Sequence, residues 1–244
     1  MPFSSSRADC SCPGRRGDAT VNHFNGAVSF IADPANWPGA GGIAERLGEH
    51  LWYSVLAVAL ALIIALPLGL YLGHTGKGAS GVIAATGALR AIPSLGLLTW
   101  LTLEISFGIQ LPIVPSTIVL LILAIPPVLA ATVSGMATVS RPVVDAARAM
   151  GHNEGQIITR IELPLAAPTI VGGVRSCVLQ VLATATISAY IGLGGLGRYL
   201  LDGLALRDYE QMLVGAILVS VLALAADVTL AFLQHRLRPK GVTS

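Results

Sequence analysis

The sequence predicts an all-α integral membrane protein with five transmembrane helices and a helix-turn-helix connection between the third and the fourth. Of the 244 residues, 54% are hydrophobic and only 11% are charged, and the mean hydropathy is +0.74. Soluble domains carry about 25% charged residues. The apolar residues also gather into five runs, each long enough for the roughly 20 residues that a helix needs to cross a bilayer.

Each run has features expected of a membrane helix. Trp52 and Tyr53 mark one interface of the first run, and Pro67 predicts a kink within it. The second and third runs carry Pro93 and the Pro126-Pro127 pair, whose freed carbonyls need neighbouring helices or a water-lined path. The expected spans are residues 51–72, 79–103, 113–135, 165–191 and 212–233.

Residues 1–42 form a polar tail that is expected to be mostly disordered or to lie on the surface, and to be extracytoplasmic. Its composition changes at Val21, after which aromatic residues appear, so residues 1–20 are hypothesised to be dispensable. The membrane domain then occupies residues 43–240. Cys10, Cys12 and Cys177 give neither a disulfide framework nor a metal site. A net charge of +2 is too small to indicate a nucleic-acid partner.

The basic residues predict the orientation. In the five-span arrangement most of them fall on one side, which the positive-inside rule makes cytoplasmic. The N-terminus is then expected outside and the C-terminus inside. The basic residues on the predicted inner side are Lys77, Arg141, Arg148, Arg160, Arg236, Arg238 and Lys240, and those on the outer side are Arg46, Arg198 and Arg207.

The connection at residues 141–164 predicts two short helices hinged at a glycine. Pro142 suits a first helical turn, and Gly151 suits the position just past a helix end, with a positive φ. Asn153 and Gln156 have the spacing of a capping box for the second helix, and Pro164 is expected to end it. The result is a compact knob on the cytoplasmic side.

This connection resembles the coupling loop of bacterial ABC-importer permeases, E-A-A-x3-G-x9-I-x-L-P. Only the first position departs from this pattern. Asp145 stands where the pattern has glutamate, so the negative charge is kept. The resemblance implies a type I ABC importer permease whose loop meets a cytoplasmic ATPase. The residues expected to make that coupling are Asp145, Ala146, Ala147, Gly151, Ile157, Ile161, Leu163 and Pro164.

Three further strings are similar to permeases of the osmoprotectant class, which import glycine betaine, choline, carnitine or proline betaine. They are residues 92–95, 162–165 and 183–197. The resemblance implies a second permease subunit, the same or different, two ATPase subunits that bind ATP and Mg²⁺, and an extracytoplasmic binding protein, all at the bacterial cell membrane. A permease for methionine or another small solute remains open, and so, less favoured, does an ion-coupled secondary transporter.

Catalytic chemistry is not indicated in this chain. The sequence contains no Walker A motif and no H-E-x-x-H, so it is expected to be a transport subunit without a cofactor or metal of its own. The glycine string at 191–197 follows a membrane helix and not a strand, which argues against a dinucleotide site and favours a tight outer re-entry. Charged residues within spans are candidates for the pathway or for intramembrane pairing. These candidates are Arg90, Arg175 and Asp227, with Pro93 beside them. Arg175 and Asp227 are expected to lie on facing helices near the cytoplasmic leaflet and to form a partly buried pair.

Overall fold

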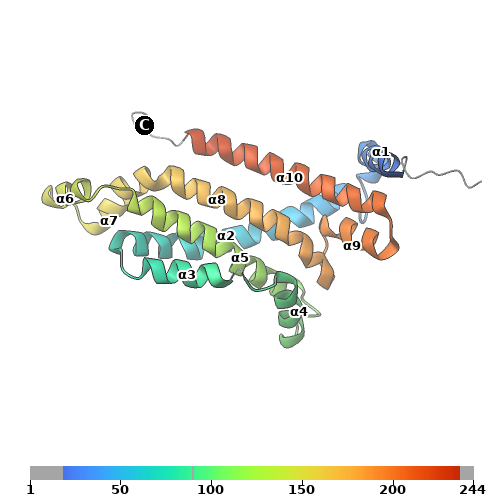
Figure 1. The fold of residues 1–244 in the computed structure, drawn as a ribbon, viewed down its shortest axis with the longest axis horizontal. Helices are drawn as coiled ribbons and strands as arrows, with labels where there is room; N and C mark the ends of the chain where they lie inside the picture. The colour runs from blue at the N-terminus through green and yellow to red at the C-terminus, as the bar shows by residue number, and fades with distance from the viewer. Residues whose placement is uncertain (1–18, 90, 237–244) are drawn as a thin grey trace, which may run out of the picture.

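The computed structural model describes residues 19–89 and 91–236, and every regular element in them is a helix (Figure 1). In chain order the elements are α1 (Ala19–Ala32), η1 (Pro34–Asn36), α2 (Ile43–Thr75), α3 (Ala79–Leu89), α4 (Ser94–Glu104), α5 (Ile113–Ala137), α6 (Arg141–Ala149), α7 (Glu154–Ile157), η2 (Ile158–Glu162), α8 (Leu163–Ala185), η3 (Thr186–Ile191), α9 (Gly197–Leu206) and α10 (Tyr209–Arg236). The segment that joins α5 to α8, residues 138–162, is called the connector. It lies at one end of the elongated bundle, and α1 and α9 lie at the other.

The centre of the bundle is the packing of α5 between α2 and α8. Along α2 a small residue recurs every four positions, at Ala57, Ala61, Ala65, Gly69 and Gly73, and the three alanines are fully buried. A Cβ on either glycine would lie less than 3 Å from an α5 side chain, that of Thr132 or Met136. Small residues at this spacing let two membrane helices approach closely, where dispersion contacts replace a hydrophobic driving force.

Four helices among the described residues are long and apolar enough to cross a membrane, so the predicted number of five is not confirmed. The exception is the second predicted span, residues 79–103. It is divided into α3 and α4, which run in different directions in Figure 1. The division falls next to Pro93, which disfavours helical geometry at Ile92. The other four predicted spans each lie within a long helix of the structure.

The prediction that Pro164 ends the second connector helix is wrong. One helix runs unbroken for 38 residues from Glu154 to Ile191. Pro164 lies near the start of α8, within this continuous helix. The turn before it is of the π type, and the Leu163 N–H bonds to the Ile158 carbonyl. This wider turn takes the helix past the proline ring.

The tail is helical from Ala19 onward, and the earlier residues, including Cys10 and Cys12, lie outside the described residues. Helix α1 packs on α10 through the fully buried Ala27 and the partly buried Ile31. Trp37 donates its ring N–H to the Ile31 carbonyl at 2.9 Å. This part of the tail is therefore ordered on the surface of the bundle, which is the second of the two arrangements expected for it.

The glycine-rich segment after η3 packs against the start of α2. Gly192 and Gly195 have φ of 90° and 88°, which only glycine adopts readily. The Gly195 N–H donates to Glu49 Oε2 at 2.7 Å. Next to it, Nε2 of the buried His50 ring lies 3.0 Å from the Leu182 carbonyl oxygen. The tight re-entry predicted for these glycines therefore holds α8 and α9 to α2.

Candidate functional site

The connector between α5 and α8, residues 138–162, forms two short helices joined at Gly151. The Gly151 N–H bonds to the Arg148 carbonyl at 2.9 Å and the His152 N–H to the Ala147 carbonyl at 3.2 Å, which is a Schellman ending for α6. Gly151 has φ of 88°, as the sequence predicts. The predicted capping box is confirmed, since Asn153 and Gln156 exchange side-chain and backbone hydrogen bonds of 2.8 and 3.0 Å.

A small apolar core holds the two connector helices together. Val144, Ala147 and Ile157 are at most 1% exposed, and the partly buried Ile161 packs against them. Ala147 and Ile157, expected from the motif to serve the coupling, therefore face the inside of the connector. Leu163 packs against Met136 and Ala166 where the connector joins the membrane helices, and Pro164 is exposed beside it.

The outer face of α6 carries exposed apolar residues that the motif does not include. Val143 is 45% exposed and Met150 73%. With the exposed Ala146 they stand at i, i+3 and i+7, so they share one face of the helix. Helical spacing could have found this face from the sequence. The choice between the Val143 face and the Val144 face needed the structure, because both are apolar.

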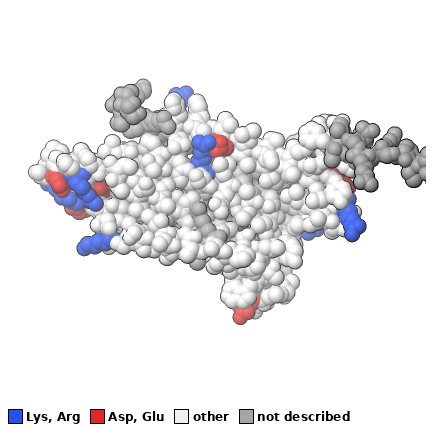
Figure 2. All heavy atoms as spheres, in the orientation of Figure 1, with Lys and Arg blue, Asp and Glu red and all other residues white. Residues whose placement is uncertain are grey.

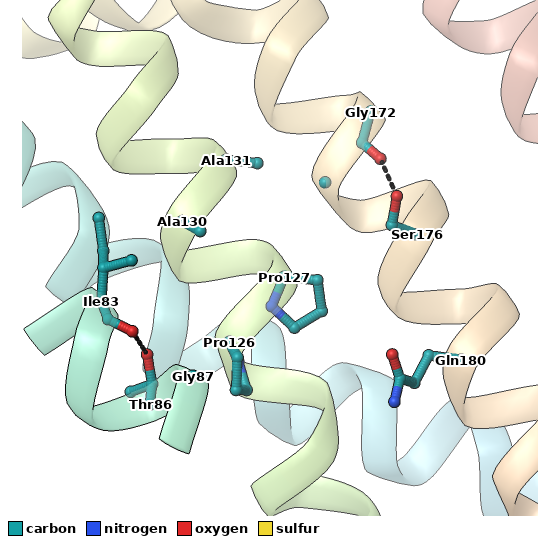
Figure 3. A pocket seen from close by; sticks show the side chains of 11 residues that line it. Ile83, Thr86, Gly87, Pro126, Pro127, Ala130, Ala131, Gly172, Ser176 and Gln180 are labelled. Atoms are coloured by element: carbon teal, nitrogen blue, oxygen red, sulfur yellow. Dashed lines mark hydrogen bonds between the residues drawn. The ribbon is translucent and has the colours of Figure 1, made fainter. Parts of the chain in front are cut away.

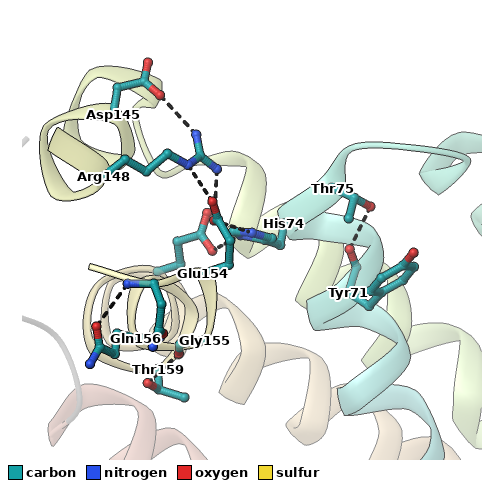
Figure 4. Close-up of polar contacts among 11 residues, drawn as sticks. Tyr71, His74, Thr75, Asp145, Arg148, Glu154, Gly155, Gln156 and Thr159 are labelled. Atoms are coloured by element: carbon teal, nitrogen blue, oxygen red, sulfur yellow. Dashed lines mark hydrogen bonds and ion pairs between the residues drawn. The ribbon is translucent and has the colours of Figure 1, made fainter. Parts of the chain in front are cut away.

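Charged side chains surround the connector helices (Figures 2 and 4). Arg148 donates to Glu154 through Nε at 2.8 Å and to Asp145 through Nη1 at 3.1 Å. The hydrogen bond to Glu154 raises the pKa of the Arg148 guanidinium above its ordinary value, and Asp145 adds to the effect. Glu154 also contacts His74, from the end of α2, at 3.0 Å. Asp145 is thus bound within α6 and remains largely exposed.

A hollow of about 460 Å³ lies among α3, α5 and α8 (Figure 3). Proline and glycine shape its walls, because Pro126 and Pro127 leave carbonyls without their usual helical donors and Gly173 brings α8 close to α5. Polar groups come from Thr86, Ser176 and Gln180. The hydroxyls bond to carbonyls of their own helices, Ser176 to Gly172 at 3.1 Å for example, whereas the Gln180 amide has no partner among the described residues.

The two candidate intramembrane charges among the described residues do not line this hollow. Arg175 and Asp227 form an ion pair between α8 and α10, as the sequence predicts. Pro93 is exposed at the start of α4 and does not line the hollow, and Arg90 lies outside the described residues.

No group of three or more His, Cys, Asp and Glu side chains in residues 19–89 and 91–236 could hold a metal ion. The two candidate sites described above are the connector and the hollow. The sequence pointed to the connector through its motif. It gave no sign of the hollow beyond its prolines, because Thr86 of α3 is brought beside Ser176 and Gln180 of α8 only by the packing of the helices.

Comparison with known proteins gives consistent matches along most of the chain. The family model described as "Binding-protein-dependent transport system inner membrane component" matches residues 61–239. The glycine betaine/carnitine/choline transport system permease protein OpuCB of Bacillus subtilis is 33% identical, over 83% of this chain and 91% of its own. The carnitine transport permease protein OpuCB of Listeria monocytogenes is 35% identical, over 80% of this chain and 87% of its own.

A solved structure shares the fold. It is an inward-facing conformation of the MetNI methionine ABC transporter, with a TM-score of 0.69 and 21% identity, and the match covers 81% of this chain and 96% of that one. The likeness confirms the predicted type I ABC importer permease fold. Together with the family match and the relatives above 30% identity, it settles the class of the protein. The chain belongs to the family of binding-protein-dependent transport system inner membrane components, and it is a multi-pass permease subunit of the bacterial inner membrane.

Proposed function

We propose that this permease subunit forms the translocation pathway of an ATP-driven importer for a quaternary-ammonium osmoprotectant such as glycine betaine, choline or carnitine. One observation carries the proposal. Relatives that are 32 to 35% identical over at least 80% of the chain are named as permeases for these solutes. ATP and Mg²⁺ are then bound by a separate ATPase. The other partners are a second permease subunit and an extracytoplasmic binding protein.

The connector is the part of the chain that meets the ATPase. Its exposed apolar face on α6, formed by Val143, Ala146 and Met150, has the character of an interface core. The charged Asp145 stands at its rim. Ala147, Ile157 and Ile161 act from inside, because their packing fixes the angle between the two short helices. Gly151, Leu163 and Pro164 set the hinge and the junction with α8.

The connector then faces the cytoplasm, and α1 and α9 lie on the outer side. The distribution of basic residues supports this orientation. Lys77, Arg141, Arg160 and Arg236 all lie at or near helix ends on the connector side of the bundle, whereas Arg198 and Arg207 flank α9. The same orientation makes residues 1–42 extracytoplasmic and brings the connector within reach of a cytoplasmic ATPase.

The hollow is a stretch of the translocation pathway. The free Gln180 amide and the hydroxyls of Thr86 and Ser176 offer weak polar contacts, which suit a solute that must leave again. None of the described residues that line it is aromatic, so this lining offers no ring to recognise a quaternary ammonium by cation–π attraction. Selection is accordingly assigned to the binding protein. Pro93 contributes by breaking the second span beside this region.

Uptake by the intact transporter tests the proposal. The chain and its genomic neighbours are expressed in cells that lack other osmoprotectant importers, and uptake of radiolabelled glycine betaine, choline, carnitine and methionine is measured. We expect saturable uptake of at least one quaternary amine that is lost when the partner ATPase is inactivated. Uptake of methionine alone would overturn the substrate class. Uptake that survives ATPase inactivation but collapses with the ion gradient would favour secondary transport.

A further inference from the structure

His74, in the last turn of α2, connects the first long membrane helix to the connector through both nitrogens of its ring. Nδ1 lies 2.6 Å from Glu162 Oε2, and Nε2 lies 3.0 Å from Glu154 Oε2 (Figure 4). The His74 side chain is only 12% exposed. A ring with a carboxylate oxygen at each nitrogen is fixed in both position and rotation.

The contact with Glu162 gives a buried polar side chain its hydrogen-bond partner. The Glu162 side chain is 3% exposed. Within the described residues, His74 is the one side chain that forms a hydrogen bond or ion pair with it. A buried carboxylate without a partner is costly, so Glu162 depends on this ring.

The backbone at the His74–Glu162 contact departs from regular α-helix. Glu162 is the last residue of the π-type turn η2, and such turns occur often at functional sites. Glu154 begins α7 and is bound on its other side by Arg148 of α6, through Nε at 2.8 Å and Nη2 at 3.1 Å. A single polar chain thus runs from buried Glu162 through His74 and Glu154 to the exposed helix α6.

The end of α2 that presents His74 is itself held firmly. Its neighbour Gly73 is so close to α5 that a Cβ there would lie 2.6 Å from the Met136 Cβ. Leu66 and Leu70 of α2 pack against a buried cluster that also receives Ile158 and Leu163 from the connector end of α8; the cluster is Met136, Ala166 and Ile170. The connector follows α5 and precedes α8 in the chain, so it is covalently joined to those two helices and not to α2. A displacement of the connector therefore reaches α2 through this packing and through the His74 bridge.

We propose that His74 is a positioning residue that joins the connector to α2, so that movement of the connector at the ATPase is passed to the first long helix as well as to α5 and α8. This inference rests on the proposed coupling role of the connector. It adds a second mechanical route, because α5 and α8 are linked to the connector covalently and α2 is linked by the Glu162–His74–Glu154 bridge.

The position of the connector can be measured without any assumption about transport. Spin labels at Lys77→Cys and Thr159→Cys, both exposed, report the distance between the end of α2 and the second connector helix in the full chain. Native cysteines are replaced by alanine. We expect a narrow distance distribution that broadens at least twofold in His74→Gln. His235→Gln, which alters an exposed histidine in the last turn of α10, is the matched control and leaves the distribution unchanged.

The functional readout is the amount of solute taken up per ATP hydrolysed by the reconstituted transporter. His74→Gln should lower this ratio about tenfold while the ATPase still co-purifies with the permease in the wild-type proportion. His74→Arg, whose guanidinium has several donors for the two carboxylates, should restore the ratio to within about threefold. A residue that served stability alone would lower the yield of assembled complex and leave the ratio in the surviving complex unchanged.

A milder variant tests the bridge in case His74→Gln does not fold. Glu154→Gln weakens only the exposed arm of the bridge, and it should broaden the label distance less than His74→Gln does. The proposal is overturned if His74→Gln leaves both the distance distribution and the uptake-to-ATP ratio at wild-type values. Failure of the underlying coupling role would look different. Met150→Cys would then form no cross-link to the ATPase in an otherwise wild-type chain, even though the label distance still broadens in His74→Gln.

Discussion

Arg175 and Asp227 form a two-pronged ion pair between α8 and α10, with Nε to Oδ1 at 2.5 Å and Nη2 to Oδ2 at 2.6 Å. Both residues lie within apolar helices, so the charges neutralise each other where water is scarce. Arg175→Gln or Asp227→Asn alone leaves one charge without its partner between two apolar helices, which is unfavourable. Each single variant should therefore lose thermal stability in detergent-solubilised, fluorescence-tagged protein.

The double variant Arg175→Gln/Asp227→Asn separates pairing from simple loss of contact. Its loss of stability should be smaller than the sum of the two single losses, because neither charge is left alone. Additive losses, or single variants as stable as the wild type, would show that the pair contributes nothing.

The glycine-rich segment makes a second prediction. A Cβ at Gly194 would collide with the Glu49 carboxylate, which accepts from the Gly195 N–H at 2.7 Å and from Arg46 at 3.2 Å. Gly194→Ala should displace Glu49 and cost about 1 to 3 kcal/mol, because a buried N–H loses its acceptor. The measurement is the thermal stability of the detergent-solubilised, fluorescence-tagged protein.

Two matched variants control this prediction. Gly48→Ala, in α2 beside Glu49, has open space at its Cβ and should be neutral or slightly stabilising, as alanine is the better helix former. Glu49→Ala already removes the carboxylate, so adding Gly194→Ala to it should cost little more. If Gly194→Ala is as stable as Gly48→Ala, the Glu49 contact does not hold the segment in place.

Features that depend on neighbours in the chain were predictable from the sequence. The Gly151 turn and the Asn153–Gln156 box are local hydrogen-bond patterns, and four of the spans are long apolar runs. The pairing of Arg175 with Asp227 was also predictable, because two opposite charges in apolar helices have few alternatives.

Features that depend on contacts between distant parts of the chain were not predictable from the sequence. Pro164 is a common stop signal, yet here a π-type turn ahead of it lets the helix continue, and no residue type announces such a turn. Ala147 and Ile157 belong to the recognisable motif, but their burial is decided by how α6 folds onto α7. The His74–Glu162 contact joins residues 88 positions apart, so the sequence alone could not have revealed it.

The orientation of the chain gives a third prediction. Asp33 lies beside η1 at the α1 end of the bundle, and Lys77 lies in the exposed turn after α2 near the connector. In intact cells a membrane-impermeant thiol reagent should label Asp33→Cys and not Lys77→Cys. Opening the cells should make Lys77→Cys reactive. The opposite pattern would place the connector outside and exclude its contact with a cytoplasmic ATPase.

Gly151 gives the last prediction. Its φ of 88° lies where a Cβ costs about 1 to 2 kcal/mol, although the space around it is open. The cost is therefore one of backbone conformation and not of collision. In Gly151→Val the β-branched residue should shift φ away from this region and so change the angle between α6 and α7. The Val143–Met150 face would then meet the ATPase in the wrong arrangement, while the membrane helices remain inserted.

Gly151→Asn is the matched control, since asparagine tolerates the left-handed region and also adds a side chain at the same exposed position. Gly151→Val should reach the membrane in normal amount, co-purify less ATPase and lose at least about 90% of solute uptake. Gly151→Asn should retain most of the ATPase co-purification and most of the uptake, because valine, unlike asparagine, is excluded from the required φ. Equal loss in the two variants would mean that the exposed surface at residue 151 matters and its backbone does not. Wild-type uptake by Gly151→Val would show that the angle between the connector helices plays no part in coupling.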